Sequence, residues 1–513
     1  MYIFCMAIFT PSQRKKATVL AQITYANPFD PARIRIERQA LGKLFKGNHA
    51  IWSYLTDSND LHNIDALNEM MTQVVNDARS NILESKTRND DDLRLYEDMV
   101  FYLLYEDTRD GLEQMLAKPQ TLNDASFMQR HYARFKKQFD HYLSLPDITM
   151  PSGHLSPHVY AVFFQIRRAF ENIFNCLVGQ SQPMAKLRQS VWQSLFTHDE
   201  RLYVRGLYAR MADFTTLITG PSGTGKELVA RAIGQSRYIP FDPRHNQFTE
   251  HYSESFFSLN LSAMSPTLIE SELFGHKRGT FTGATSDRKG WLEVCPALGA
   301  VFLDEIGELD LTIQVKLLRV LQSRTFQRLG ESKDRHFAGK IIAATNRDLP
   351  LEMQSKTFRE DLYYRLCSDI ITTPSLAEQL SDEPQDLTRL VTFILKRLLG
   401  DDALDALPKV LACIHEQLGD EYPWPGNIRE LQQCVSNILI RGCYQPRTCV
   451  QDVDPREALK TLTEQGTLSA DALLNRYCHW MYEKLGNYEA AAAQLGLDRR
   501  TVKKRVDEAA LEH

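Results

Sequence analysis

Short apolar runs alternate with helical stretches in the middle of this chain. Five runs are rich in β-branched or aromatic residues, and most of them end on a polar residue or a glycine. They are TTLITG (215–220), FFSLN (256–260), AVFLDE (300–305), KIIAATN (340–346) and SDIITTP (368–374). Continuous apolar strands separated by helices predict a parallel sheet covered on both faces. Ligands of such sheets bind beyond the carboxyl ends of the strands, where the polar residues of this sequence collect.

The regions on either side of this pattern are helical. Apolar residues recur at three- and four-residue steps over 64–83 and 126–143, and again over 386–399 and 426–442. The later pair predicts a helical lid on the sheet, and Pro446 and Pro455 mark a linker after it. We therefore expect five parts, which are an N-terminal region (1–175), an α/β subdomain (176–376), a lid (377–447), a linker (448–465) and a small helical unit (466–513).

The N-terminal region offers little chemistry in its sequence. It has no glycine-rich loop and no His or Cys at metal-binding spacing. The acidic run Asn89-Asp90-Asp91-Asp92 fits a solvated helix start better than a metal or phospho-acceptor site. The apolar opening of the chain predicts a first strand.

Composition and charge narrow the class of protein. The 513 residues carry a net charge of −5 and a pI near 6.3, so any nucleic-acid contact must be confined to a local patch. Nine cysteines without a CxxC pair suit a reducing compartment better than a disulfide frame or a zinc site. No stretch approaches membrane-spanning length, and we expect a cytoplasmic protein.

A phosphate-binding loop follows the first strand of the sheet. GPSGTGKE fits the pattern G-x-x-x-x-G-K and precedes a predicted helix, so backbone N–H groups and the helix N-terminus can hold phosphate oxygens. Lys226 can reach the β- and γ-phosphates. Glu227 stands where a magnesium-binding Ser or Thr usually follows the lysine. The predicted nucleotide-binding residues here are Gly220, Pro221, Ser222, Gly223, Thr224, Gly225, Lys226 and Glu227.

Carboxylates at the end of the AVFLDE run complete a hydrolytic site. Asp304 can order magnesium, and Glu305 can polarise the attacking water. Helix capping is the alternative role for such a pair. Asn260 and Asn346 end two other strands, and each could equally be a turn residue.

The sequence from about residue 177 to the C-terminus resembles the AAA+ ATPases of bacterial enhancer-binding proteins, which activate sigma-54 RNA polymerase. The motifs that carry this resemblance are GPSGTGKELVARAI, FFSLNLSAM, ESELFGHKRGTFTGAT, AVFLDEIGELDLTIQVKLLRVLQ, AATNRDL, FREDLYYRL and YPWPGNIREL. In this family a Glu after the phosphate-loop lysine is usual. The implied fold is a doubly wound five-stranded α/β AAA+ core with a helical lid, a mostly helical N-terminal domain and a small all-α C-terminal domain.

The resemblance implies a role for each site residue. ATP and Mg²⁺ would be held by the phosphate loop and Asp304, with Glu305 as the base that activates water. Asn260 would restrain or release Glu305, and Asn346 would be the first sensor. Arg429 of GNIREL would be the second sensor, which ties the lid to the nucleotide.

Arg359 and Arg365 of FREDLYYR match the arginine fingers of the family. They would act on ATP bound by the neighbouring subunit in a homo-oligomer, from a dimer to a hexameric or heptameric ring. The alternative is that both arginines pair with Glu360 or Asp361 on a solvated helix.

A phenylalanine between two glycines matches the polymerase-contacting loop of the family, usually GAFTGA. In this chain it consists of Gly279, Thr280, Phe281, Thr282, Gly283 and Ala284. Glycines on both sides let the loop rise or fold, and an exposed aromatic ring is costly unless a partner covers it. A Phe281 that is tucked into its own domain is the alternative.

Two departures from the family pattern bear on coupling. TTPSLAEQL stands where the family usually has LPPLRER, which removes the arginines between strand and lid. Pro221 takes a position that is commonly Glu. Neither change removes a catalytic group.

The C-terminal segment GNYEAAAAQLGLDRRTVKKRV resembles a Fis-type helix-turn-helix. An alanine-rich helix is followed by a turn at Gly496-Leu497 and a basic second helix, which Asp498 can cap. Such a helix suits phosphate contacts and entry into the major groove of double-stranded DNA. Arg505 shares this basic helix, and a packing surface is the alternative to DNA binding. The predicted DNA-binding residues are Arg499, Arg500, Thr501, Lys503 and Lys504.

The sequence thus predicts a DNA-bound ring ATPase that remodels sigma-54 RNA polymerase for open-complex formation. One alternative is a AAA+ unfoldase or chaperone, which would not need the terminal DNA-binding unit. Another is a regulator of sigma-70 promoters that keeps the ATPase fold for oligomerisation, which would not need the polymerase-contacting loop. The N-terminal region is expected to regulate the ATPase or to be structural, and its signal cannot be read from the sequence.

Overall fold

The computed structural model describes residues 8–47, 62–84, 89–251, 255–446 and 469–511. Contacts between Cα atoms divide the chain into two compact units, Met1–Cys443 and Tyr444–His513. The five predicted parts remain a prediction at their boundaries, and the linker 448–465 lies outside the described residues.

A five-stranded parallel sheet is the centre of the first unit. Its order is β11-β1-β10-β7-β4, and every pair of neighbours is parallel. The strands are β1 (Thr216–Thr219), β4 (Phe256–Asn260), β7 (Ala300–Asp304), β10 (Lys340–Thr345) and β11 (Asp369–Thr372). All five fall inside the runs predicted from the sequence, so the doubly wound AAA+ fold is confirmed.

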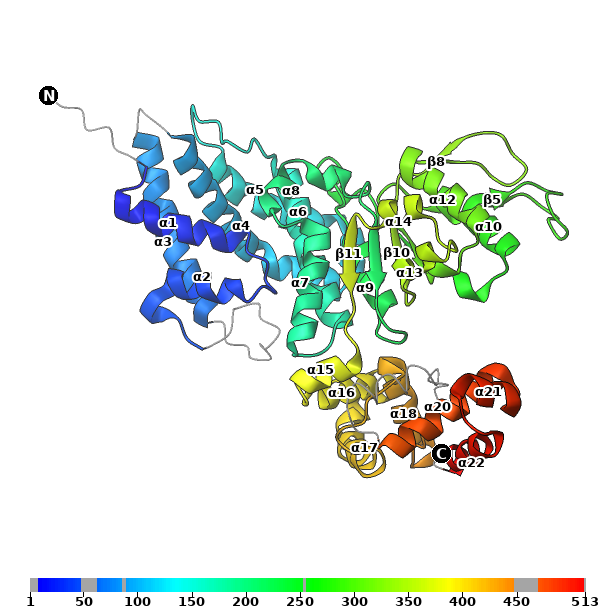
Figure 1. Cartoon of the computed structure of the whole chain (residues 1–513). Helices are drawn as coiled ribbons and strands as arrows, with labels where there is room; N and C mark the ends of the chain where they lie inside the picture. The colour runs from blue at the N-terminus through cyan, green and yellow to red at the C-terminus, as the bar shows by residue number, and fades with distance from the viewer. Residues whose placement is uncertain (1–7, 48–61, 85–88, 252–254, 447–468, 512–513) are drawn as a thin grey trace. The chain divides into compact units, whose positions relative to one another are not determined.

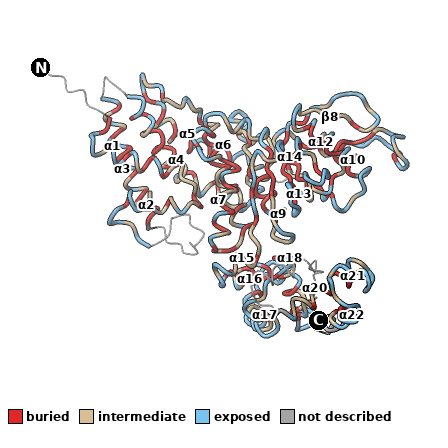
Figure 2. Tube along the Cα trace, in the orientation of Figure 1, coloured by how far each residue is buried: buried red, intermediate tan, exposed pale blue. Residues whose placement is uncertain are grey.

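Alternate residues of each strand enter different hydrophobic cores. Ile218, Phe302 and Ile342 pack with the helices of one face, while Leu217, Leu303 and Ile341 pack with those of the other. The first face is covered by α6 (Ser156–Cys176), α7 (Gln182–Phe196) and α9 (Lys226–Gly234). The second is covered by α10 (Pro266–Phe274), α12 (Leu311–Ser323) and α14 (Glu360–Leu366). Burial on both faces explains why the strands read as continuous apolar runs (Figures 1 and 2).

Smaller elements complete this subdomain. They are α8 (Glu200–Arg205), β2 (Phe241–Asp242), β3 (Gln247–Phe248), β5 (Gly275–His276), β6 (Arg288–Lys289), α11 (Trp291–Val294), β8 (Thr325–Phe326), β9 (Arg335–His336) and α13 (Leu349–Gln354). Short 3₁₀ turns follow β4 at Leu261–Ala263 and β7 at Ile306–Glu308.

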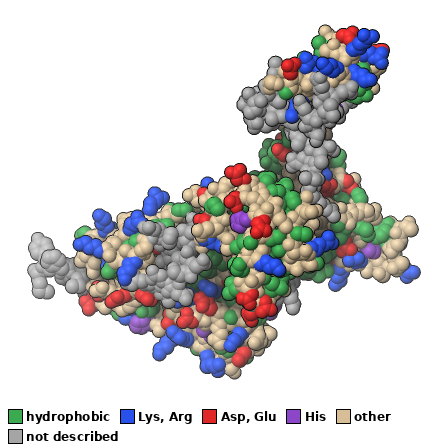
Figure 3. Space-filling model, turned by 90° about the horizontal axis from the view of Figure 1, so that it is seen from below, with side chains coloured by type: hydrophobic (Ala, Val, Ile, Leu, Met, Phe, Trp, Pro, Cys, Tyr) green, Lys and Arg blue, Asp and Glu red, His purple; other side chains and the backbone are tan. Residues whose placement is uncertain are grey.

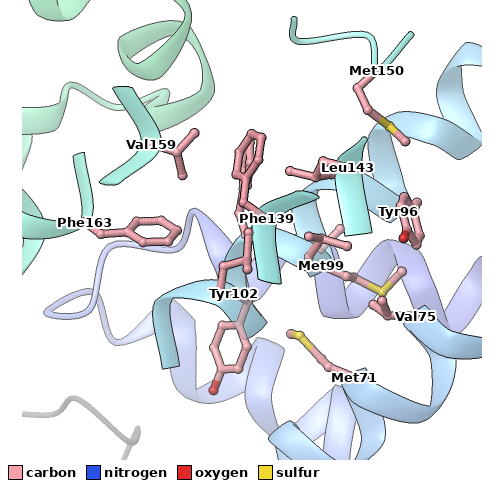
Figure 4. Packing of buried hydrophobic residues seen from close by; sticks show 14 of the residues in the cluster. Met71, Val75, Tyr96, Met99, Tyr102, Phe139, Leu143, Met150, Val159 and Phe163 are labelled. Atoms are coloured by element: carbon pink, nitrogen blue, oxygen red, sulfur yellow. The ribbon is translucent and has the colours of Figure 1, made fainter. Parts of the chain in front are cut away.

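Six helices form the N-terminal region and its boundary with the sheet. They are α1 (Pro11–Thr24), α2 (Ala32–Leu41), α3 (His62–Glu84), α4 (Asp90–Ala117), α5 (Ala125–Leu143) and α6. Long apolar side chains of α3, α4, α5 and α6 interlock in the core, as Figure 4 shows around Met99 and Phe139. The helical reading of this region is confirmed.

The prediction of a first strand is wrong for the part of the opening segment that can be described. Residues 1–7 lie outside the described residues, and Ile8 and Phe9 form a bend. Thr10 then caps α1 in a capping box with Gln13, and Pro11 occupies its first position. A capping residue followed by proline starts a helix more strongly than the preceding apolar run starts a strand.

The acidic run begins a helix as predicted. The Asn89 side chain accepts a hydrogen bond from the backbone N–H of Asp91 at 3.0 Å, and α4 starts at Asp90. Asp92, however, is buried and pairs with Arg14 at 2.9 Å, so the run is only partly solvated.

Helix α6 joins the N-terminal region to the sheet. The buried Arg168 donates to the backbone carbonyls of Gln235 and Arg237, and Gln165 donates to that of Ser236 at 3.0 Å. In the opposite direction, Phe241 of the β2–β3 hairpin is buried in the N-terminal core. The N-terminal helices and the α/β subdomain therefore share buried contacts.

The lid consists of α15 (Leu376–Asp382), α16 (Asp386–Leu399), α17 (Ala403–Leu418) and α18 (Asn427–Arg441). The fully buried Asp386 accepts hydrogen bonds from the backbone N–H groups of Gln180 (2.7 Å) and Ser181 (3.0 Å), just before α7. A single lid carboxylate thus fixes the segment that leads into the sheet.

The second unit holds α20 (Ala470–Leu485), α21 (Tyr488–Leu495) and α22 (Arg499–Leu511). Its core contains Cys478, Met481, Ala491, Val502 and Val506. Gly496 ends α21 with a positive φ of 65°, which produces the predicted turn.

Candidate functional site

The loop between β1 and α9 has the backbone of a phosphate-binding loop. Gly220, Gly223 and Gly225 have positive φ angles of 141°, 79° and 90°. A Cβ on Gly223 would lie 2.4 Å from the Gly426 carbonyl of the lid. Glycine is needed here both for its backbone angles and for the close approach of the lid.

Lys226 occupies the mouth of this loop. It is 7% exposed, and its Nζ donates to the carbonyls of Gly220 (3.0 Å) and Pro221 (3.1 Å). Burial lowers the pKa of Lys226, while the charges of Glu305 and Asp304 raise it. The ammonium group is held where a phosphate would replace the two carbonyls as its acceptor.

The residues around Lys226 fix the loop from both sides. The Thr224 hydroxyl donates to the Pro221 carbonyl at 2.9 Å and lies 2.7 Å from the Thr373 hydroxyl. Glu227 lies on the exposed side of α9, where it pairs with Arg231 at 3.0 Å. The carboxylate that replaces the usual Ser or Thr is therefore engaged by its own helix.

Asp304 and Glu305 lie together at the carboxyl end of β7. Burial raises the pKa of Asp304, the charge of Glu305 raises it further, and Lys226 lowers it. Glu305 has a left-handed backbone (φ 56°), and its N–H donates to Oδ1 of Asp304 at 3.1 Å. A non-glycine residue in this conformation is costly, and such strain is often retained at functional sites.

The two predicted asparagines lie on the strands next to β7. Asn260 of β4 is in register with Asp304, and its side-chain oxygen accepts from the N–H (3.0 Å) and hydroxyl (2.8 Å) of Ser262. Asn346 follows β10, and its backbone N–H, rather than its side chain, donates to Oε2 of Glu305 at 3.2 Å. The fold brings both residues to the carboxylate edge, and their roles as switch and sensor stay predictions.

The two predicted arginine fingers lie at opposite ends of α14. Arg359 makes two hydrogen bonds to Asp361, at 3.0 and 2.7 Å, which is the pairing that the sequence left open as an alternative. Arg365 is exposed, and its guanidinium has no hydrogen bond or ion pair to another described residue. Within the described residues, neither arginine is bonded to the phosphate loop of its own chain.

The lid contacts the phosphate loop through its helix α18. Arg429 donates to the Ser222 hydroxyl at 2.9 Å. Asn427, buried and with φ 54°, donates to the Ser222 carbonyl at 3.0 Å and accepts from the N–H of Leu376 at 2.8 Å. Sequence reasoning did not single out Asn427, although a Gly-Asn pair before a helix indicates a special backbone angle.

Thr373, directly after β11, connects that strand to β1 and to the phosphate loop. Its N–H donates to the Thr219 carbonyl at 2.8 Å, and its hydroxyl faces both that carbonyl and Thr224. The hydroxyls of Thr219 and Thr372 lie 3.1 Å apart. These threonines form a polar link from β11 to the phosphate loop.

The glycine-flanked phenylalanine lies at the tip of a hairpin. Strands β5 and β6 pair at its base, and the loop extends away from the sheet (Figure 1). Gly279 (φ 82°) and Gly283 (φ 106°) bracket a turn that is closed by the Gly279 N–H donating to the Ala284 carbonyl at 2.8 Å. The ring of Phe281 is half-buried and packs edge-on against that of His276, with the two ring centroids 5.0 Å apart.

Thr280, the departure from GAFTGA, anchors the loop. Its hydroxyl donates to the carbonyls of Lys277 and Leu329. Thr282 is exposed at the tip, whereas Ala284 is buried. The loop in this conformation is folded toward its base.

The basic helix of the second unit has one exposed side. Arg499, Arg500, Thr501, Lys503 and Lys504 are all exposed, and Asp498 caps the helix by accepting from the N–H of Arg500 at 2.8 Å. Figure 3 shows Lys and Arg side chains gathered on the described surface of this unit. Arg505 differs, because it donates to Asn475 (2.8 Å) and pairs with Asp471 (3.2 Å) of α20. Arg505 therefore stabilises the packing of the unit.

The described residues contain neither a membrane-spanning helix nor a metal-binding cluster of side chains. No helix there is long and apolar enough to cross a bilayer. No group of three or more His, Cys, Asp or Glu side chains in these ranges could hold a metal ion by itself.

Comparison with known proteins identifies the central part of the chain. Residues 200–372 match the family model described as the Sigma-54 interaction domain. A signal-transduction and transcriptional-control protein of Clostridium beijerinckii is 35% identical over 66% of this chain and 49% of its own length. The Nif-specific regulatory protein of Azotobacter vinelandii is 42% identical over 47% of this chain and 42% of its own. The formate hydrogenlyase transcriptional activator FhlA of Escherichia coli is 33% identical over 69% of this chain and 48% of its own.

These matches cover only part of each protein. The chain spans about half the length of the curated relatives it matches. A crystal structure of NtrX from Brucella abortus superposes with a TM-score of 0.38 at 25% identity, covering 70% of this chain and 76% of that one. So low a score adds nothing to what the domain match gives.

Proposed function

We propose that this chain, whose residues 200–372 belong to the sigma-54 interaction domain family, is a DNA-bound ATPase that remodels sigma-54 RNA polymerase for open-complex formation. One observation carries the proposal. A phosphate loop facing two carboxylates and a hairpin tipped by Phe281 belong to the same subdomain. An ATPase site and a protruding polymerase contact are the two parts that such a machine requires.

ATP is the substrate for which the loop is built. Lys226 and the backbone N–H groups at the start of α9 would hold the phosphates, with Arg429 moving from the Ser222 hydroxyl to the nucleotide. Glu305 would take the proton from the attacking water, oriented by the N–H of Asn346. Asn260 lies beside Asp304 and could exchange its bonds to Ser262 for one to Glu305.

The carboxylates fit a magnesium ion. Burial and the charge of Glu305 raise the pKa of Asp304. A divalent cation between these adjacent carboxylates would reduce their mutual repulsion. Mg²⁺ keeps several waters and binds through one or two carboxylates plus phosphate oxygens, so one protein ligand, Asp304, suffices. The ion would neutralise charge on the phosphates.

The arginines support an inter-subunit site. Arg365 is exposed and unpaired within the described residues, and Arg359 is held only by an exposed pair with Asp361. Exposed ion pairs contribute little, about 0–1 kcal/mol, so that pair can open when a neighbouring subunit presents ATP. We therefore propose a homo-oligomeric ring in which each subunit completes the site of the next.

The hairpin is the proposed contact to sigma-54. The ring of Phe281 packs on His276, the Phe281 carbonyl accepts from the N–H of Ala284 at 3.0 Å, and the glycines on both sides permit other backbone angles. The loop could therefore lift the ring to a partner at modest cost. Thr280 opposes this movement by its hydrogen bonds, which makes it a brake that GAFTGA loops lack.

The second unit is the proposed DNA reader. Five exposed polar residues on α22 could contact phosphates and base edges, although Arg499 would have to leave an exposed ion pair with Glu489 (3.2 Å), while Arg505 holds α20 and α22 together. Such units commonly bind as dimers to half-sites one helical turn apart. Binding upstream of a promoter would concentrate the ATPase near the polymerase.

A purified transcription assay tests the whole proposal. The full chain is mixed with sigma-54 or sigma-70 polymerase on the DNA that lies upstream of its own gene. Either ATP or a non-hydrolysable analogue is added. We expect open complexes only with sigma-54 polymerase and ATP. Opening with the analogue would refute a need for hydrolysis, and opening with sigma-70 polymerase alone would support the alternative regulator.

The phosphate loop has its own test. Lys226→Ala should weaken ATP binding by at least tenfold, measured by nucleotide titration, because the variant lacks the buried cation. Lys277→Ala, which removes an exposed lysine paired with Asp287, is the matched control. Equal affinity of both variants would remove the phosphate-loop assignment.

A further inference from the structure

A cavity of about 90 Å³ lies between the N-terminal helices and the first helices of the ATPase subdomain. Its walls come from the end of α1 and the turn after it, from α2, α4 and α6, and from α7 and α8. Seven aromatic side chains line it, among them Tyr25, Phe163 and Trp192. No residue of the nucleotide site takes part in it.

The charges around the cavity do not balance. Arg33 is neutralised by Glu37 at 2.8 Å, and Glu106 is paired with Arg109 at 2.7 Å. Glu200 is 8% exposed, and among the described residues its one side-chain donor is the neutral Trp192 indole, at 2.7 Å. Burial raises the pKa of Glu200 to about 7, although the charge of Arg33 lowers it. Arg33 is paired with Glu37, so within the described residues Glu200 has no ion-pair partner of its own, and a buried acid without one is costly.

Two polar atoms of lining residues lack partners as well. The Tyr102 hydroxyl and Oε1 of Glu106 are buried, and neither has a hydrogen-bond partner among the described residues. Tyr102 is 5% exposed, and Figure 4 shows its hydroxyl directed away from Met99, with Val159 and Phe163 nearby. Buried groups of this kind normally hold a ligand or ordered water.

We propose that this cavity binds a compact organic ammonium ion. The ammonium group would supply the cation that Glu200 lacks and donate hydrogen bonds to Oε1 of Glu106 and to the Tyr102 hydroxyl. The apolar part would lie against the aromatic rings, whose faces attract cations. A carboxylate ligand is disfavoured by Glu106 and Glu200, since Arg33 is already engaged by Glu37 and by the Ala26 carbonyl.

The size of the cavity limits the ligand. An engineered apolar cavity of about 150 Å³ takes benzene, with six heavy atoms. By proportion, about 90 Å³ suits roughly four heavy atoms. Such a small ligand is expected to bind with a dissociation constant of about 0.1–10 mM.

The position of the cavity connects it to the ATPase. Trp192 lies on α7, whose other residues pack on the sheet together with α9, the helix that follows the phosphate loop. Ligand binding would brace α7 and α8 against the N-terminal helices. An effect on ATP hydrolysis rests on the proposed function, whereas binding itself does not.

Three probes with four heavy atoms each separate charge from size. Isopropylammonium, 2-propanol and acetate are titrated into the full chain by calorimetry. We expect saturable binding of isopropylammonium, at least tenfold weaker binding of 2-propanol and none of acetate. Equal binding of all three, or no binding of the amine, would overturn the proposal, the latter leaving ordered water as the occupant.

Variants locate the site. Glu200→Gln should weaken isopropylammonium binding by at least tenfold, and Tyr102→Phe by about threefold. Glu97→Gln and Tyr96→Phe change a buried acid and a buried tyrosine of α4 outside the cavity, and both should bind normally. Circular dichroism checks that each variant is folded. If the control variants lose binding as well, the site is elsewhere.

ATP hydrolysis is then measured with and without isopropylammonium. A change of twofold or more that Glu200→Gln abolishes would add regulation to binding. Binding without any change would refute the link to the ATPase but leave the ligand site standing.

Discussion

Charged groups at the carboxyl edge of the sheet lie near opposite charges, whereas those in the N-terminal core do not all have such a neighbour. At the edge, Lys226 faces Asp304 and Glu305, so opposite charges lie close together and partly in water. In the helical core, Glu200 is buried with no ion-pair partner and Tyr102 with no hydrogen-bond partner among the described residues. The edge is prepared for a charged substrate that arrives with its own counter-ion, whereas the core lacks a charge that a ligand could bring.

The sharpest test of the edge removes its base. Glu305→Gln should reduce ATP turnover by roughly 10² to 10⁴ while leaving ATP binding intact, because only proton transfer is lost. Phosphate release and nucleotide titration measure the two quantities. Glu308→Gln, whose carboxylate pairs with Arg347 away from Asp304, is the control. Normal turnover by Glu305→Gln would show that the carboxylate edge does not activate water.

A second test asks whether the edge is complete within one chain. Arg365→Ala should lower hydrolysis by roughly 10³-fold or more if it stabilises the transferring phosphoryl group, and Arg359→Ala should behave alike. Neither should affect DNA binding. Mixing Arg365→Ala with Lys226→Ala, which keeps its arginines, should restore part of the activity. Absence of rescue at any ratio would place the arginines in the same subunit as their ATP.

A change in the hairpin tests whether ATP hydrolysis and open-complex formation can be separated. Phe281→Ala should keep ATP turnover within about twofold yet lose open-complex formation, because the ring packs on His276 of the hairpin rather than on a residue of the nucleotide site. Val315→Ala removes another exposed apolar side chain of the same subdomain and should open promoters normally. If Phe281→Ala opens promoters as well as Val315→Ala does, the ring serves only to pack on His276.

The smallest effect concerns the buried acid of the helical core. The folded-state pKa of Glu200, about 7, exceeds its ordinary value of 4.5, so the folded protein holds this proton more tightly than the unfolded chain. The contribution of this group to the free energy of unfolding is fully present below pH 4.5. It is lost as the pH rises through 7, and the total loss is up to about 3 kcal/mol. Thermal unfolding between pH 5 and 7.5 measures this loss.

Glu200→Gln should flatten that dependence and be the more stable form above pH 7. Part of the slope should remain, since burial also raises the pKa of Asp98, to about 6. An unchanged slope in the variant would show that Glu200 is ionised in the folded protein across this range.

Sequence patterns predicted the sheet because the signal for each strand lies within a few neighbouring residues. Each predicted strand contains the observed one, and β4 coincides with FFSLN. The phosphate loop and the two carboxylates lie in unbroken motifs, so their meeting follows from parallel strands alone. The opening segment was misread because Thr10 and Pro11 start a helix after a short apolar run.

Other contacts could not be read from the chain. Asn427 and Asp386 bind backbone groups about 200 positions away, which no local pattern encodes. In the sequence, Arg505 shares the basic helix with the predicted DNA-binding residues. In the structure it donates to Asn475 of α20 instead. The N-terminal cavity is the extreme case, because its charged residues Arg33, Glu106 and Glu200 come from three different helices.

The sequence by itself determined the AAA+ sheet, the nucleotide-binding motif and the hairpin with its phenylalanine, because strand periodicity, glycine backbone angles and strand-end polarity act over a few residues. Tertiary structure alone decided that Asn346 reaches Glu305 through its backbone, that Asp361 holds Arg359 and that Phe281 lies on His276. It also decided that Glu200 is buried beside Trp192, with no ion-pair partner in the described part of the chain. These contacts depend on how packed elements orient their side chains, which is fixed only when the elements come together.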